Sequence, residues 1–181
     1  MFPNLGATTF LARGVLLGTL IVGLSTHGIA HGVPPHGGDV PTPTLAIRDG
    51  ELAAAVHRAV WGAARLLEQP TCAEVLDEFI DVGGRPLRDV LETLTLSPTA
   101  SLSRIIFRDG SDHLACRRGG IVAFTGPGSR VVFVCGNRFG ALERLRAQHV
   151  VIHEMLHTLG LGERPPASGF IDRAVARRCT G

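Results

Sequence analysis

The first regular pattern of hydrophobic positions covers residues 49–67, where apolar residues recur every three or four positions. This spacing predicts an amphipathic helix with one buried face. Asp49 can cap its first turn, and Pro70 is expected to end it. Further helices are expected at residues 72–80, at residues 87–94 and after Ser97.

The pattern changes in the middle of the chain. Three short runs are rich in β-branched and aromatic residues and are bounded by turn-forming residues, which is typical of strands. The sequence Gly-Pro-Gly-Ser at residues 126–129 predicts a hairpin between the second and third runs. The predicted strands are residues 104–108, 121–125 and 130–135.

Helical spacing returns in the last part of the chain. A long helix is predicted from residue 141 to 159, with Gly160 and Gly162 ending it, and a short amphipathic helix at residues 170–177. Helices, then strands, then a long helix form a segregated order, which favours an α+β fold over alternating βαβ units. We therefore expect N-terminal helices, a small and mostly antiparallel sheet, a long helix and a short C-terminal helix.

The N-terminus has the features of an export signal. Arg13 is followed by an apolar run at residues 15–24, and Gly28 and Ala30 provide the small residues of a cleavage site. Residues 1–30 are thus predicted to be a signal peptide, residues 31–48 a Pro- and Gly-rich flexible lead-in, and residues 49–181 one domain. The protein is expected to be secreted or periplasmic, or membrane-anchored if the signal is not removed.

The composition adds two constraints. The net charge is only +2 and the basic residues are scattered, so the sequence gives no reason to expect nucleic-acid binding or, after signal cleavage, membrane binding.

An even number of cysteines in an exported chain predicts two disulfides, with three possible pairings. A four-cysteine metal site is the alternative, although no close CxxC pair is present. The four residues are Cys72, Cys116, Cys135 and Cys179.

Two histidines on the long helix predict a metal site. His153 and His157 are four residues apart, so both can face one zinc ion at ~2.0–2.1 Å. Glu154 follows the first histidine and is expected to act as the general base toward a zinc-activated water. The alternative is two partly buried histidines that make polar contacts at a helix end, with Glu154 and Glu163 on the surface.

A catalytic zinc ion needs a third protein ligand. Gly160 can leave the helix in a left-handed conformation, so the chain can turn back toward the metal. Glu163 then lies six residues beyond His157 and is the expected third ligand, with Asp172 as the alternative. A glutamate with two histidines is an established zinc ligand set.

The segment HEMLHTLGLGE, residues 153–163, resembles the zincin metallopeptidases, and its extended form is similar to the metzincin motif HExxHxxGxxH/D. The resemblance covers eleven residues and implies that His153, His157 and Glu163 bind zinc and that Glu154 is the base. Metzincins have His or Asp where this chain has Glu163, and their methionine turn has no counterpart here. The segment also resembles small exported bacterial proteins with zincin-like sites.

The expected activity is zinc-dependent hydrolysis of an amide bond in a peptide or protein substrate. A substrate strand could pair with an exposed sheet edge at residues 121–125 or 130–134. The alternatives are a zinc amidase acting on a non-protein amide and a disulfide-stapled metal-binding module without catalysis. Candidate oxyanion donors are His113, His149 and Arg164, and candidate residues for orienting the histidine rings are Thr158 and Asp172.

Overall fold

The computed structural model describes residues 42–181, so the expected signal peptide and most of the expected lead-in lie outside the described residues. The elements, in chain order, are β1 (Thr44–Ala46), α1 (Gly50–Leu67), α2 (Pro70–Ala73), the 3-10 helix η1 (Glu74–Glu78), α3 (Leu87–Thr93), α4 (Pro98–Leu102), β2 (Ile106–Asp109), α5 (Leu114–Arg118), β3 (Ala123–Phe124), β4 (Val131–Val134), α6 (Gly136–Gly140), α7 (Arg144–Thr158) and α8 (Ser168–Arg178).

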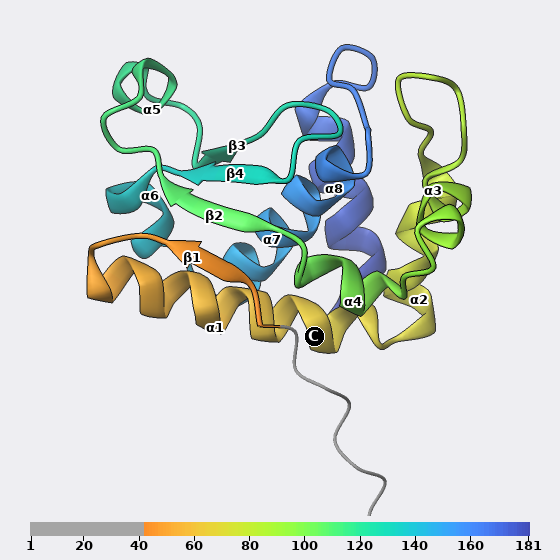
Figure 1. The fold of residues 1–181 in the computed structure, drawn as a ribbon, viewed down its shortest axis with the longest axis horizontal. Helices are drawn as coiled ribbons and strands as arrows, with labels where there is room; N and C mark the ends of the chain where they lie inside the picture. Colours follow the sequence, from red (N-terminus) through yellow and green to blue (C-terminus); the bar gives the residue numbers. More distant parts are fainter. Residues whose placement is uncertain (1–41) are drawn as a thin grey trace, which may run out of the picture. The chain divides into compact units, whose positions relative to one another are not determined.

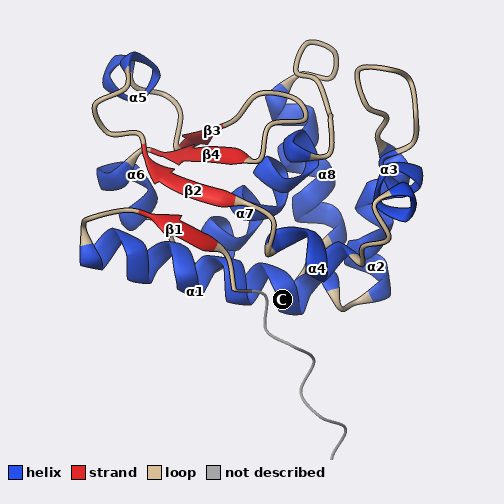
Figure 2. Ribbon diagram, in the orientation of Figure 1, coloured by secondary structure: helices blue, strands red, loops and turns tan. Residues whose placement is uncertain are grey.

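The predicted α+β class is confirmed, because helices surround one small sheet (Figure 2). The strand order is β1-β2-β4-β3. Strands β1 and β2 are parallel, β2 and β4 are parallel, and only β3 and β4 are antiparallel. The expectation of a mostly antiparallel sheet is therefore wrong. Parallel strands need a long connection between them. Helices α1 to α4 connect β1 to β2, and α5 and β3 lie between β2 and β4.

Strand β1 was not expected. It lies inside residues 31–48, the segment predicted as a flexible lead-in, and pairs with β2 in the register Thr44↔Ile106. The ordered domain therefore begins before Asp49. Figure 1 shows β1 at the sheet edge next to α1, which runs alongside it.

Helix α1 follows the predicted pattern. The Asp49 carboxylate accepts hydrogen bonds from the backbone N–H groups of Glu51 and Leu52 at 2.8 and 3.0 Å, which is the expected N-cap. Its apolar stripe is buried, with Val56 and Val60 fully inaccessible to solvent. The helix ends at Leu67, three residues before Pro70.

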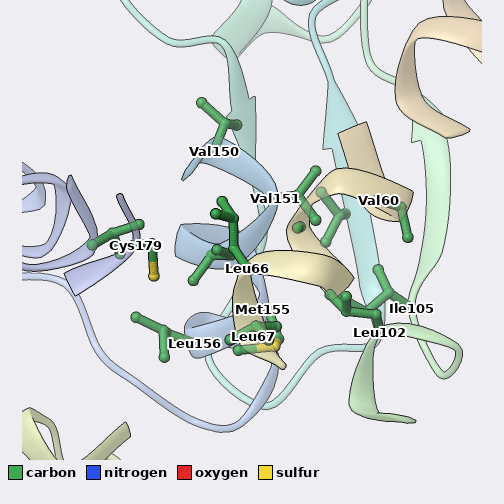
Figure 3. Packing of buried hydrophobic residues seen from close by; sticks show 14 of the residues in the cluster. Val60, Leu66, Leu67, Leu102, Ile105, Val150, Val151, Met155, Leu156 and Cys179 are labelled. Atoms are coloured by element: carbon green, nitrogen blue, oxygen red, sulfur yellow. The ribbon is translucent and has the colours of Figure 1, made fainter. Parts of the chain in front are cut away.

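The main core lies between α1, α4 and α7. Figure 3 shows Val60 and Leu67 of α1 close to Val151 and Met155 of α7, with Leu102 of α4 beside them. These side chains are almost completely buried. Because α7 carries the candidate metal-binding histidines, its packing against α1 fixes the rotation of the helix and hence the face that those histidines occupy.

Both predicted disulfides are confirmed, and the structure decides their pairing. Cys72–Cys179 joins α2 to the end of α8, and Cys116–Cys135 joins α5 to the start of α6. Since all four cysteines of the chain are oxidised in pairs, the alternative of a four-cysteine metal site is ruled out. Within residues 42–181, no helix has the length and apolar character needed to cross a membrane.

Candidate active site

A small cleft of about 160 Å³ lies where β3, α7 and α8 meet. One wall is formed by residues 120–125, which include β3. The other walls come from one face of α7 and from Glu163, Ser168 and Asp172. Figure 1 shows that these segments, which are distant in sequence, lie side by side.

The two motif histidines come together in this cleft. His153 and His157 lie four residues apart on α7, and their Nε2 atoms face each other at 3.1 Å. Both side chains are nearly completely buried. The helix therefore brings the two rings into the arrangement expected from their spacing.

The other ring nitrogen of each histidine is held by an acceptor. His157 Nδ1 lies 2.8 Å from the backbone carbonyl oxygen of Leu161, and His153 Nδ1 lies 2.9 Å from Asp172 Oδ1. The hydrogen bond with His153 lowers the pKa of Asp172 to about 2, so this carboxylate is ionised and accepts. A carbonyl oxygen also only accepts, so both Nδ1 atoms carry the proton and donate it.

With Nδ1 protonated, the Nε2 of a neutral imidazole carries a lone pair. Burial lowers the pKa of His157, which favours its neutral form. Two Nε2 lone pairs that face each other at 3.1 Å repel unless a proton or a metal cation lies between them. Two nitrogens bound to one tetrahedral zinc ion at ~2.0–2.1 Å are about 3.4 Å apart, so this pair fits two of its ligand positions.

Glu154 lies beside the histidine pair and is itself buried, with only 5% of its surface exposed. Its Oε2 atom has no hydrogen-bond partner among residues 42–181. The pKa of Glu154 is raised to about 7, mainly by burial; His153 opposes this shift, and the negative charges of Glu163 and Asp172 contribute to it. A carboxyl group with a pKa near neutrality suits a general base.

The expected third ligand is less well defined. Glu163 lines the same cleft, but its side chain is exposed. Across the described range 42–181, no three His, Cys, Asp or Glu side chains are grouped so that they could hold a metal ion. Asp172, the alternative ligand, instead binds His153 through Oδ1 and Arg146 through Oδ2 at 3.1 Å. Asp172 therefore orients a ring of the candidate pair.

The three oxyanion donors considered from the sequence do not line the cleft. His149 Nε2 is engaged with the backbone carbonyl of Cys179 at 2.7 Å, and His113 caps α5 by accepting from the N–H of Ala115. Arg164 lies in the turn after the motif, where its N–H donates to the carbonyl of Pro166. Thr158 donates to the carbonyl of Met155, so it does not orient either histidine ring.

Arg146 lines the cleft and brings a positive charge to it. This residue was not predicted from the sequence. It lies seven residues before His153, which is two helical turns, so it shares the same face of α7. This spacing is the signal that could have identified it. Ser168, at the start of α8, also lines the cleft and was not predicted.

Gly160 makes the turn that follows the motif. Its φ is +107°, in the region that favours glycine, and a Cβ atom there would lie 2.9 Å from the Cβ of Asp81. Asp81 is held in place by hydrogen bonds from the N–H groups of Gly83 and Arg85. The turn directs the Leu161 carbonyl toward His157. Helix α7 ends at Thr158, so the predicted role of Gly160 in ending the helix is confirmed.

We expect Gly160→Ala to destabilise the fold by more than about 1 kcal/mol, because the alanine would combine an unfavourable φ with a clash against Asp81. Denaturant unfolding measures this loss. Gly50→Ala is the matched control, since no atom lies within 4 Å of the position of its added Cβ and it lies at the start of α1. Equal stabilities of the two variants would contradict the strain assigned to Gly160.

Searches with protein-family models, with characterised proteins and with solved structures gave no match to this chain.

Proposed function

We propose that the protein is an exported zinc-dependent hydrolase that cleaves amide bonds in peptides. The observation that carries this proposal is the pair of facing Nε2 atoms, 3.1 Å apart, with both Nδ1 atoms engaged by acceptors. His153 and His157 would hold the zinc ion, and Glu163 would complete the ligand set by a side-chain movement from its exposed position at the cleft wall.

A zinc ion bound there would supply a Lewis acid that polarises the scissile carbonyl and lowers the pKa of a water molecule. Glu154 would accept the proton of the attacking water at its carboxylate and pass it to the leaving amine. Asp172 and the Leu161 carbonyl would hold the two rings in the required tautomer. Arg146, the cation in the cleft, is a candidate to stabilise the oxyanion.

A peptide substrate is favoured by the position of β3. This strand forms one wall of the cleft and is the last strand of the described sheet, paired on one side with β4. Its other edge can accept an extended chain by main-chain hydrogen bonding. Substrate strand addition would bring a peptide bond alongside Glu154.

Export is supported by the two disulfides, which are typical of proteins in oxidising compartments. The predicted signal peptide at residues 1–30 would deliver the chain to such a compartment. We propose a secreted or periplasmic location on these grounds.

The direct test is the metal content and peptidase activity of the purified protein. We expect one zinc ion per chain, and we expect His157→Asn to lose it, because the variant removes one of two buried imidazole ligands. His57→Asn is the control, since His57 is exposed on α1 and lies outside the cleft. His153→Asn provides a second variant, and circular dichroism checks that each one folds.

The outcomes separate the candidate functions. Purified protein without a stoichiometric divalent ion would overturn the proposal. Bound zinc without hydrolysis of peptides or of cell-wall amides would favour the metal-binding module over the enzyme. Hydrolysis restricted to cell-wall amides would favour the amidase.

We expect Asp172→Asn to weaken zinc binding by about 10- to 100-fold, because the amide replaces the carboxylate that accepts from His153 Nδ1. Competition with a chelator of known affinity measures this change. Asp112→Asn is the control, since Asp112 is exposed and lies outside the cleft. Unchanged affinity in the Asp172 variant would show that this carboxylate does not orient the ring.

A further inference from the structure

A second and larger groove, of about 890 Å³, runs along α1. One wall comes from α1 and the other from residues 139–148, which include the end of α6 and the start of α7. The groove shares no lining residue with the candidate active site. Its volume lies within the range of ligand-binding pockets, ~300–1,000 Å³.

The groove has an excess of positive charge. Three guanidinium groups line it, from Arg58, Arg65 and Arg144, and Glu68 is the single acidic side chain among its described lining residues. Within residues 42–181, none of the three arginines has a hydrogen bond or ion pair from its side chain. Other surface arginines are paired, as Arg177 and Arg178 are with Glu78. Others in the described part of the chain, such as Arg117, are not; the groove differs in bringing three unpaired guanidinium groups together. Unpaired guanidinium groups are available to an anionic ligand.

An aromatic side chain lies among these charges. Trp61 is 43% exposed, and the Arg65 guanidinium lies 5.2 Å from the centre of its ring. Next to it, Gly62 leaves room for Gln148, because a Cβ atom at Gly62 would lie 2.1 Å from the Gln148 amide nitrogen. The groove therefore offers an apolar ring face and an amide between two cations.

The spacing of the cations sets the shape of the ligand. Arg58, Trp61, Gly62 and Arg65 follow the i, i+3, i+4, i+7 pattern and form one stripe on α1. Seven residues of helix place the α-carbons of Arg58 and Arg65 about 10 Å apart along the axis. With α-carbons this far apart, the two guanidinium groups can each pair with a separate carboxylate. Two carboxylates three residues apart on a polyproline II segment are separated by about 9 Å.

We propose that this groove binds an acidic peptide segment of a partner protein. Two carboxylates of the segment, three residues apart, pair with Arg58 and Arg65, and an apolar side chain between them contacts Trp61. Arg144, on the opposite wall, adds positive charge that attracts the segment.

Trp61 makes the proposal easy to test, because it is the only tryptophan in the sequence. The probe is the capped peptide acetyl-Glu-Leu-Pro-Glu-amide, which has no fluorescence of its own at tryptophan wavelengths. We expect a saturable change in Trp61 fluorescence and a dissociation constant that rises with NaCl concentration. The matched peptide with both glutamates replaced by glutamine should give no saturable change.

Variants of the full chain locate the binding site. We expect Arg58→Gln and Arg65→Gln each to raise the dissociation constant by about two- to fivefold, and the double variant by about tenfold. Arg117→Gln, which removes an exposed guanidinium outside the groove, is the charge-matched control and should bind as the wild type does.

Three results with the peptides would overturn the proposal, and a fourth would come from a compact anion. These are no saturable change up to about 5 mM peptide, equal binding of the glutamine peptide, and an equal loss of affinity in Arg117→Gln. Inorganic pyrophosphate that binds as tightly as the peptide would also overturn it, since the groove would then select a compact anion. The binding measurement needs no zinc and no hydrolysis. A result that overturns peptide binding would therefore leave the proposed enzymatic function unaffected.

Discussion

Glu154→Gln is expected to reduce peptide hydrolysis by about 10²- to 10⁴-fold while zinc remains bound. Glutamine keeps the size of the buried side chain but cannot accept the proton of the attacking water. Since Glu154 is not among the proposed ligands, the metal content should not change. The measurement is the initial rate of hydrolysis together with the zinc stoichiometry of the same preparation.

The control for this variant is Glu143→Gln, which replaces an exposed glutamate just before α7. It should hydrolyse peptides as the wild type does. Full activity in the Glu154 variant would remove the glutamate from the mechanism. Loss of zinc in that variant would instead identify Glu154 as a ligand.

The same variant should also change how stability depends on pH in the metal-free protein. Burial raises the pKa of Glu154 from 4.5 to about 7, so above pH 4.5 the unfolded chain loses this proton more readily than the folded one. Ionisation therefore favours unfolding. Between pH 4.5 and 8, the free energy of unfolding of the wild type should fall by about 3 kcal/mol relative to that of Glu154→Gln. Unfolding in a chelator at both pH values measures this difference, and an unchanged difference would contradict the raised pKa.

Removing the Cys72–Cys179 disulfide by a double alanine substitution is expected to lower the free energy of unfolding by about 5 kcal/mol. The bond joins residues 107 positions apart, so reducing it gives the unfolded chain a large gain in conformational freedom. Both cysteines are fully buried, and the Cys179 carbonyl is also engaged by His149. Urea unfolding under oxidising conditions measures the loss.

The second disulfide is the internal control. Cys116 and Cys135 are only 19 positions apart, so their replacement by alanine should cost less, about 3 kcal/mol. A larger loss for this pair than for Cys72–Cys179 would contradict the dependence on loop length. The wild type in the same buffer, with and without a reductant, gives a reference for the combined effect of both bonds.

The long helices were predictable because their signals are local. Helix α1 has both a periodic apolar stripe and an Asp49 cap, and α7 ends where Gly160 interrupts its pattern. The five-residue helices α5 and α6 were not predicted, since such short segments have little intrinsic stability and depend on tertiary contacts. Sequence periodicity cannot detect elements of that kind.

The sheet was harder to predict because strand direction depends on partners far along the chain. Strand β1 has only three residues, in a segment rich in proline and threonine, and it pairs beyond α1–α4 with β2. The turn at residues 126–129 was visible in the sequence, and β3 and β4 are antiparallel as it predicts. Parallel pairing of β2 with β4 has no local signature.

In the candidate site, too, the features with a local signal were predictable and those that depend on long-range packing were not. The approach of His153 to His157 follows from helical spacing alone. The partners of their Nδ1 atoms, Asp172 and the Leu161 carbonyl, depend on where α8 and the Gly160 turn pack. Two possible roles for Asp172 could be named from the sequence, but only the folded chain distinguishes orienting a ring from binding a metal.

Parallel pairing of β1 with β2 has a consequence for the order in which the chain can fold. The first strand has no neighbour until the chain beyond α4 has been made, and α1 completes its core only with α7 near the other end. Structures dominated by such distant contacts fold slowly. The packing that fixes the rotation of α7 therefore forms only when the two ends of the domain have met, and the candidate metal-binding motif cannot be separated from the first helix.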